Sequence, residues 1–247
     1  MERSYWEKIA PAYNDEIFDV LANDAKAIIK KTIRRFASKE SSVIDIGCAI
    51  GKWLPILSPA FKKVYAIDIS QQNLDIAKRM HSRFGNIVYQ RVDMSNPKAT
   101  VPKCDFAICI NAILTGTLQK RNIFFKNLKK CVKKNGYIIL VIPSFESFML
   151  TSVIRQRWDP DKDSKRSIDK KKLLPQLQNM LEGSANIDGV PHKHYLKEEL
   201  DLLLNNEGFA AKEFSKIEYE WKTEFLKPPR WLKDPKPWDW IVLAKRL

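Results

Sequence analysis

The chain has 247 residues, which is enough for one α/β domain with a sizeable core. A composition with 45% hydrophobic and 29% charged residues is ordinary for a globular protein and excludes disorder along the whole chain. No apolar run approaches the roughly 18 residues that span a bilayer, and no signal-peptide core opens the chain, so we expect a cytoplasmic protein. The formal net charge of +14 indicates either an acidic partner (nucleic acid, an anionic membrane or a phosphorylated substrate) or lysine-rich solvated faces without a partner.

The positions of cysteine and histidine argue against a metal centre. The four cysteines have no paired C-x-x-C spacing and lie on or beside expected core elements, so we predict buried thiols. They are Cys48, Cys104, Cys109 and Cys131. With only three histidines, a Cys/His cage would have to be assembled from distant segments, and we predict no metal site.

Residues 1–40 are predicted to be helical and to precede the first strand. Apolar residues recur at helical spacing in a first run, which comprises Tyr5, Trp6, Ile9 and Tyr13. A second amphipathic run comprises Ile17, Leu21, Ile28 and Ile29. We therefore expect an N-terminal helical segment.

The stretch from Val43 to Leu54 is predicted to form a strand, a turn of small residues and the start of a helix. Gly47, Ala49 and Gly51 stand at alternate positions in the turn, so the backbone can come close to a ligand. The first N–H groups of the following helix favour a polar or negatively charged group above the strand. The spacings of a dinucleotide fingerprint and of a phosphate-binding P-loop are both absent. The turn thus predicts a seat for a nucleotide-like ligand.

The pattern Asp45-x-Gly47-x-Ala49-x-Gly51 resembles the first motif of class I S-adenosylmethionine-dependent methyltransferases, in particular the small-molecule and quinone type. Ala49 replaces the usual middle glycine and adds only a methyl group, so we expect it to trim the space near the ligand without closing the site. The resemblance implies S-adenosyl-L-methionine as cofactor and a doubly wound, Rossmann-like α/β fold. The implied sheet has seven strands, mostly parallel, with the last strand antiparallel between the fifth and sixth.

Asp68 ends the second predicted strand, Val64 to Asp68. An acid about 20 residues beyond the glycine turn accepts hydrogen bonds from ribose hydroxyls in doubly wound nucleotide-binding folds. This supports a nucleoside ligand, which NAD and S-adenosylmethionine share. We assign Asp68 and the neighbouring Ile69 to the cofactor site, and Ser70 is predicted to cap the next helix.

The next two strands end in further candidates for the site. A third strand at residues 87–92 runs into Asp93 and Met94, which by resemblance face the adenine. A fourth strand at residues 105–110 is followed by Asn111, where the family holds the reacting methyl group. The Asn/Asp-Pro-Pro-aromatic motif of amino-methylating branches is absent there, which disfavours methylation of nucleic-acid bases or glutamine amides.

The later elements continue the alternation of strands and helices. A basic helix is predicted from Leu118 to Lys134, followed by a glycine turn at Gly136 and a strongly apolar strand that ends at Pro143. This alternation predicts a parallel, doubly wound sheet. Two further strands are expected at residues 209–221 and 240–244.

Residues 144–194 are too long for a plain connection and are predicted to be a substrate-recognition insertion over the carboxyl edge of the sheet. Ser144 is predicted to cap a helix with one apolar face, formed by Phe145, Phe148, Met149 and Val153. A second helix is suggested by Leu173, Leu177, Met180 and Leu181. The many basic residues indicate an acidic substrate or a membrane surface, with a solvated flap as an equal alternative.

By the same resemblance, residues 1–40 form a lid, and the whole chain, 1–247, is a single methyltransferase domain. The segment from Tyr5 to Tyr13 resembles the N-terminal segment that folds over the cofactor in many small-molecule methyltransferases. Tyr13 is therefore assigned to the cofactor or acceptor pocket, with an aromatic stripe on the sheet as the alternative. For Trp6 we expect the core.

His192 and His194 are the candidates for a general base. A sulfonium already carries an activated methyl group, so only an acceptor with a tightly held proton, such as a hydroxyl, needs one. Both precede a helix at the carboxyl edge of the sheet, although a loop histidine that is exposed and idle is the simpler alternative. We expect methyl transfer to a small-molecule acceptor, acidic or lipid-like in character. Transfer to RNA or another polyanion, peripheral membrane contact, and a non-catalytic regulator or scaffold that binds the cofactor stay open as alternatives.

Overall fold

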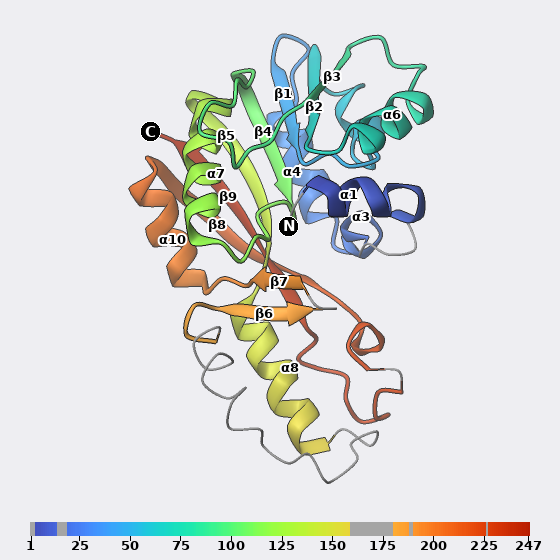
Figure 1. Ribbon diagram of the computed structural model, residues 1–247, viewed down its shortest axis with the longest axis vertical. Helices are drawn as coiled ribbons and strands as arrows, with labels where there is room; N and C mark the ends of the chain where they lie inside the picture. The colour runs from blue at the N-terminus through green and yellow to red at the C-terminus, as the bar shows by residue number, and fades with distance from the viewer. Residues whose placement is uncertain (1–2, 14–18, 159–179, 188–189, 226) are drawn as a thin grey trace.

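The computed structural model describes residues 3–13, 19–158, 180–187, 190–225 and 227–247 (Figure 1). The helices are α1 (Arg3–Ile9), η1 (Ala10–Ala12), α3 (Val20–Asn23), α4 (Ile28–Phe36), α5 (Leu54–Leu57), α6 (Gln71–Met80), α7 (Leu118–Cys131), α8 (Phe145–Trp158), α10 (Lys197–Asn206) and η2 (Trp221–Thr223). The strands are β1 (Ser42–Ile46), β2 (Lys63–Asp68), β3 (Ile87–Arg91), β4 (Cys104–Ile110), β5 (Val132–Pro143), β6 (Ser184–Ile187), β7 (Val190–Lys193), β8 (Phe209–Glu218) and β9 (Trp238–Arg246).

A seven-stranded sheet with the order β3-β2-β1-β4-β5-β9-β8 forms the centre of the molecule, and β6 pairs with β7 in a separate hairpin (Figure 1). The first five strands run parallel, whereas β9 is antiparallel to both β5 and β8. This confirms the predicted doubly wound sheet with its antiparallel last strand. The strand order reverses between β1 and β4, and ligands of such sheets bind beyond the carboxyl ends of the strands at this point.

Helices cover both faces of the sheet, because its central strands are apolar on both sides. On one face, Phe124 of α7 and Leu204 of α10 pack in a core cluster with Ile44 of β1. On the other face, Ile33 of α4 packs in a second cluster with Val43, together with residues of α5 and α6. Val43 and Ile44 are neighbours in one strand and therefore point to opposite faces. The two clusters fix β1 and the turn that follows it.

The basic helix is shorter than predicted. α7 ends at Cys131, because Val132 already pairs with β4 as the first residue of β5. The predicted glycine turn lies inside β5 as an irregularity of the pairing, where Asn135 takes the left-handed φ of 64°. Gly136 is needed for a different reason, since a Cβ atom there would stand 2.7 Å from the Asp105 carbonyl oxygen.

The second N-terminal run forms two helices, α3 and α4, instead of one. Ala27 interrupts the run with a φ of 53°. The Asp24 carboxylate accepts hydrogen bonds from the backbone N–H groups of Ile28, at 2.6 Å, and Lys30, at 3.2 Å, and so caps α4. Ile17 of this run lies outside the described residues.

The predicted insertion contributes α8 and the hairpin of β6 and β7. Ser144 caps α8 as predicted, because its hydroxyl accepts a hydrogen bond from the Ser147 N–H at 3.0 Å. The predicted apolar face is wrong: Val153 is 56% exposed, whereas Ser147 and Ile154 are buried. Through Ile154 the buried face packs against Trp221, Phe225 and Leu232.

The second helix predicted in the insertion falls largely outside the described residues, as Leu173 and Leu177 do. Met180 and Leu181 are described, and both are exposed. The four cysteines are buried free thiols, as predicted. In the described part of the chain, no helix is long and apolar enough to cross a membrane, and no group of three or more His, Cys, Asp or Glu side chains could hold a metal ion.

Candidate active site

The turn after β1 holds three small residues in the left-handed backbone region. Gly47, Ala49 and Gly51 have φ angles of 73°, 48° and 82°. The N–H groups of Gly47 and Cys48 both donate to the Ile67 carbonyl oxygen, at 2.8 and 3.0 Å, which ties the turn to β2. An alanine tolerates such a φ less well than glycine does, so Ala49 is a locally strained substitution in this motif.

The two glycines of the turn serve different purposes. A Cβ atom on Gly47 would stand 2.6 Å from the Ala112 side chain, in the loop after β4. A Cβ atom on Gly51 would stand 2.6 Å from Leu54 and 2.9 Å from His81. Gly47 therefore lets the loop after β4 approach the turn, while Gly51 lets α5 and α6 pack behind it.

Asp68, at the end of β2, is held by hydrogen bonds from two turns. Its carboxylate accepts from the Ala49 N–H at 2.9 Å, from the Ser70 N–H at 2.8 Å and from the Asn73 amide at 3.5 Å. Burial raises the pKa of Asp68, while these hydrogen bonds lower it. Ser70 also caps α6, as predicted, by accepting from the Asn73 N–H at 3.1 Å. The carboxylate is thus fixed in one orientation.

Asp45, near the end of β1, is buried with an unmet acceptor. Its Oδ2 atom has no hydrogen-bond partner in the described chain. Burial, and after it the negative charge of Asp68, raises the pKa of Asp45 to about 8. A cationic group placed beside this carboxyl would favour its ionised form.

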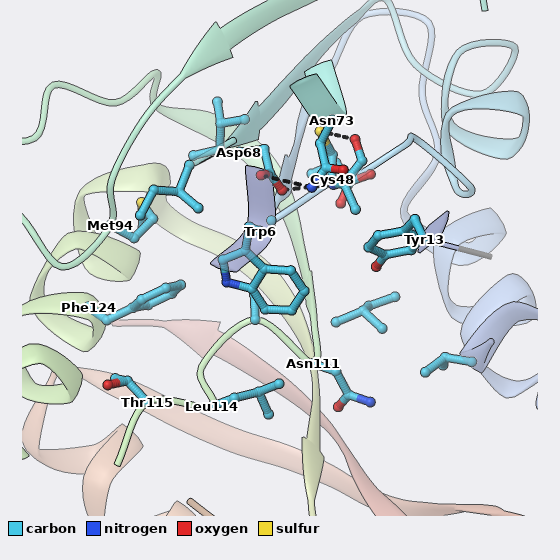
Figure 2. Close-up of a pocket in the computed structure, with 18 of the residues that line it drawn as sticks. Trp6, Tyr13, Cys48, Asp68, Asn73, Met94, Asn111, Leu114, Thr115 and Phe124 are labelled. Atoms are coloured by element: carbon cyan, nitrogen blue, oxygen red, sulfur yellow. Dashed lines mark hydrogen bonds between the residues drawn. The ribbon is translucent and has the colours of Figure 1, made fainter. Parts of the chain in front are cut away.

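A cavity of about 380 Å³ lies at the carboxyl ends of β1, β2 and β4, within the size range of small-molecule sites. Predicted site residues that line it are Tyr13, Asp45, Gly47, Ala49, Asp68, Ile69, Asp93, Met94, Asn111, His192 and His194. Gly51 is the predicted site residue that stands apart from the lining. Figure 2 shows Asp68 and Asn73 at one end of the cavity and Leu114 and Thr115 at the other.

Glu7 of α1 anchors the N-terminal helices to the cavity. Its carboxylate accepts hydrogen bonds from the N–H groups of Gln71 and Gln72, both at 3.0 Å, and from the Ser70 hydroxyl at 2.9 Å. Burial raises the pKa of Glu7, but these hydrogen bonds outweigh it and lower the pKa to about 2. The ionised Glu7 side chain therefore caps the N-terminus of α6, although α1 and α6 are far apart in sequence, and this cap lies beside Asp68.

Three aromatic residues of the N-terminal segment line the cavity: Tyr5, Trp6 and Tyr13. The expectation that Trp6 belongs to the core is wrong, since its half-buried indole stands in the cavity (Figure 2). Lys52 of the glycine turn lies 5.8 Å from the Tyr13 ring and 2.8 Å from the Asp19 carboxylate. This ion pair is a second tie between the N-terminal segment and the turn.

Asn111 follows β4 with a left-handed φ of 48°. Its Nδ2 donates to the Asp239 carboxylate of β9 at 3.0 Å, while its Oδ1 has no partner in the described chain. Burial raises the pKa of Asp239 to about 6, against hydrogen bonds from Tyr219 and Asn111 that lower it. Asp239 thus orients the amide and leaves its oxygen as an acceptor.

The hairpin of β6 and β7 brings both predicted histidines to the cavity. The Nδ1 of His192 lies 2.8 Å from the Val190 carbonyl oxygen, so in the neutral ring Nδ1 carries the hydrogen and Nε2 is the acceptor. The ring of His194 packs 4.9 Å from that of Phe148 in α8. Burial lowers the pKa of His194 to about 4, which makes this ring neutral near pH 7.

Further lining residues are not among the predicted site residues, and they include Tyr5, Cys48, Asn73, Leu114, Thr115, Lys120 and Phe124. Phe124 packs in the core cluster beside α7 and also lines the cavity. Cys48 could have been found from its place inside the glycine turn. Which residues of the loop after β4 turn inward depends on its backbone path, for which the sequence offers no periodic signal.

Comparisons with known proteins agree with this architecture. A family model described as a methyltransferase domain matches residues 21–211. A solved S-adenosylmethionine-dependent methyltransferase from Methanosarcina mazei is 20% identical, with a TM-score of 0.63, over 87% of this chain and 97% of that one. Magnesium protoporphyrin IX methyltransferase from Synechocystis, with bound S-adenosylhomocysteine, is 14% identical, with a TM-score of 0.58, over 99% and 98%.

The N-methyltransferase NodS from Bradyrhizobium japonicum, in complex with S-adenosylhomocysteine, is 13% identical, with a TM-score of 0.60, over 99% of this chain and 97% of that one. No curated protein matches the chain. At these identities the solved structures show a shared fold, and the family model, which spans most of the chain, shows the family. The chain belongs to the methyltransferase domain family and is a class I S-adenosylmethionine-dependent methyltransferase.

Proposed function

We propose that this methyltransferase acts on a small-molecule or lipid-like acceptor held inside the cavity. The observation that carries the proposal is the lining beyond Asn111, where Leu114, Phe124 and Pro143 form an apolar wall and Thr115 and the hairpin histidines are polar. An apolar pocket with a few convergent polar groups suits a small molecule. One similar protein is named for magnesium protoporphyrin IX, which is a small molecule with a large apolar ring.

The opposite end of the cavity suits the cofactor. The fixed Asp68 carboxylate has acceptor capacity left for ribose hydroxyls, and Asp93 and Met94 line the wall assigned to the adenine. The unpartnered Oδ2 of Asp45 suits the positively charged part of S-adenosylmethionine. Ala49 contributes only a methyl group to the wall, so it leaves this end open.

When bound, the cofactor supplies an activated methyl group on its sulfonium, so the chain has to position the acceptor and exclude water. Of the N-terminal region predicted as a lid, residues 3–13 serve in that role, with Trp6 and Tyr13 covering the cavity, whereas α4 packs in the core cluster on the sheet. The segment 144–194 supplies the wall that carries the two histidines, and both parts belong to one domain over 1–247.

The polar groups at the acceptor end have separate tasks. The Oδ1 atom of Asn111 accepts a hydrogen bond from the acceptor and thereby orients it. For a hydroxyl acceptor, Nε2 of His192 takes the proton as the methyl group is transferred. His194 supports the wall as a neutral ring against Phe148.

Transfer of a labelled methyl group distinguishes the classes of acceptor. The enzyme is incubated with radiolabelled S-adenosylmethionine and an extract that has been separated into small-molecule, lipid, RNA and protein fractions. We expect label in the small-molecule or lipid fraction, and none with Asp68→Ala. Label confined to the RNA fraction, together with salt-dependent retardation of RNA in a gel, would contradict the proposal.

A further inference from the structure

The far end of α8 and the segment 221–238 carry an exposed aromatic pair. Trp158 ends α8, Trp231 lies between η2 and β9, and their ring centroids are 5.3 Å apart at 74°. The two residues are 43% and 59% exposed. Figure 1 shows this end of α8 pointing away from the large sheet. Two touching indoles in water are an unusual feature that a domain core does not require.

A small buried cluster lies next to the two tryptophans in sequence and supports the backbone that carries their exposed rings. Ile154 of α8 packs with Trp221, Phe225 and Leu232 in a buried cluster that is separate from the two clusters of the sheet. Trp158 follows Ile154 by one helical turn, and Trp231 is the neighbour of Leu232. Because these anchors are buried, the indoles are presented on a supported surface.

Three cations lie close to the aromatic pair in sequence, together with one exposed acid, Asp234. The guanidinium of Arg157 lies 5.0 Å from the centroid of the Trp158 ring, and Arg230 and Lys233 flank Trp231 in sequence and are exposed. The Glu224 carboxylate, in the same region, lies 3.6 Å from Arg155 and is compensated by it. We name the five residues Arg157, Trp158, Arg230, Trp231 and Lys233 the tryptophan patch.

We propose that the tryptophan patch binds an anionic lipid surface. Indole rings partition into the interface between headgroups and acyl chains, and arginine and lysine are attracted to anionic headgroups. The edge-to-face arrangement at 74° disfavours single-stranded nucleic acid, whose successive bases need parallel ring faces for stacking. The net charge of +14 acts in the same direction as the patch.

Docking through the patch leaves the cavity accessible. α8 has 14 residues and is therefore about 21 Å long, and its first turn lies next to the cavity wall at Pro143. The patch at its other end can contact a bilayer while the lid and the glycine turn stay in water. Lipid docking through the patch is therefore independent of which acceptor the enzyme methylates.

Sedimentation with lipid vesicles tests the proposal. We expect the full chain to pellet with vesicles of phosphatidylcholine and phosphatidylglycerol and to stay in the supernatant with phosphatidylcholine alone. Binding should weaken about fivefold for each of Arg157→Gln, Arg230→Gln and Lys233→Gln, and about tenfold for Trp231→Ala. Lys126→Gln, which removes an exposed charge from α7, and Leu202→Ala, which removes an exposed apolar side chain from α10, serve as matched controls.

Several results would overturn the proposal. One is a wild-type chain that is absent from both vesicle pellets. Another is that the patch variants bind vesicles as tightly as the two controls do. A third is a chain that retards RNA in a gel through the patch but does not bind vesicles. Loss of a dimer in Trp231→Ala, seen by analytical ultracentrifugation, would instead identify a second copy of the chain as the occupant. Trp231→Phe keeps an aromatic ring, and its melting temperature and vesicle binding show whether a loss in Trp231→Ala reflects the patch or the fold.

Discussion

Asp45 is a buried carboxyl group whose ionisation lowers the stability of the fold, and we propose that it serves cofactor binding. Its Oδ2 has no partner in the described chain, and burial raises its pKa to about 8. Because the unfolded value is about 4, the folded protein holds the proton more tightly than the unfolded chain between these two pH values. Stability must therefore fall as the pH rises from about 4 to about 8.

We expect Asp45→Asn to raise the melting temperature of the ligand-free protein by about 5 °C at pH 8.5, because the variant has no buried carboxylate to ionise. The gain should shrink as the pH is lowered to 5, where wild-type Asp45 is protonated. Thermal unfolding at a series of pH values measures this. A gain that is the same at pH 5 and pH 8.5 would show that ionisation of Asp45 is not its cause.

Cofactor binding should have the opposite dependence. A carboxyl with a pKa of about 8 is ionised about 25-fold more at pH 8.5 than at pH 6.5, so wild-type affinity for S-adenosylmethionine should rise by a similar factor. Asp45→Asn should remove this rise and bind at least about tenfold more weakly at pH 8.5. Calorimetric titrations at both pH values measure the affinity of the two proteins for S-adenosylmethionine. A wild-type affinity that does not change with pH would refute the role given to Asp45.

Gly51 belongs to the packing of the turn, since its missing Cβ makes room for Leu54 and His81. Gly51→Ala places an alanine at a φ of 82° and creates a contact of 2.6 Å, which together should destabilise the fold by about 2 to 4 kcal/mol. The melting temperature should fall by about 4 to 16 °C. Gly85→Ala is the control, because no atom lies within 4 Å of the added Cβ. Equal melting temperatures for the two variants would contradict this assignment.

At the residue scale, the sequence predicts best where chain position alone determines the role. Asp68 ends a strand and Ser70 starts a helix, so spacing suffices to place both. Gly47 and Gly51 occupy equivalent positions in the motif, yet only the structure shows which one lines the cavity. Trp6 has helical spacing, but spacing cannot say whether a helix covers a core or a cavity.

At the scale of elements, the contact between α1 and α6 decides how the cavity is covered. The Glu7 carboxylate satisfies the first N–H groups of α6, which would otherwise face water. With a pKa of about 2, Glu7 is ionised at every pH at which the protein would be assayed. The N-terminal segment is therefore held over the cavity by a charge-assisted cap and, through Lys52 and Asp19, by an ion pair.

We expect Glu7→Ala to loosen the lid, because removal of a helix cap costs about 1 kcal/mol. Amide hydrogens of residues 3–13 should exchange faster, and affinity for S-adenosylhomocysteine should fall about fivefold if closure contributes that free energy to binding. Hydrogen-exchange mass spectrometry and calorimetry measure the two effects. Glu40→Ala, at an exposed position with a distant partner at 3.7 Å, is the control. Unchanged exchange in Glu7→Ala would show that α1 is not held in this way.

Helices and strands could be predicted where a single hydrophobic pattern dominated the sequence. They could not be predicted where a helical pattern competed with strand pairing or carried little hydrophobic signal. The apolar runs of β1, β2, β4 and β5 are buried on both faces, and the sequence predicts them all. The end of α7 is wrong in the prediction because pairing of Val132 with β4 overrides a helical pattern that continues through it. The wrong face of α8 has a similar origin, since its small buried residues carry little hydrophobic signal.

At the scale of the molecule, the cavity lies where the strand order reverses, and residues distant in sequence meet there. The strand ends at the end of the cavity that we propose for the cofactor are predicted by motif and resemblance. The end that we propose for the acceptor is lined by the N-terminal segment, the loop after β4 and the hairpin of β6 and β7, whose arrangement depends on tertiary packing. The identity of the acceptor is therefore the part of the function that the sequence determines least.

The central claim is that the glycine turn and Asp68 form the cofactor site of this enzyme, and binding of S-adenosylhomocysteine by calorimetry tests it most directly. We expect Asp68→Ala to bind at least about 30-fold more weakly than the wild type, since the charge-assisted hydrogen bonds to the ribose are worth about 2 kcal/mol. Asp68→Asn keeps the shape of the side chain, and the exposed Asp75→Ala on α6 is the control. If folded Asp68→Ala and Asp68→Asn bind S-adenosylhomocysteine as tightly as the wild type and Asp75→Ala do, the account is contradicted.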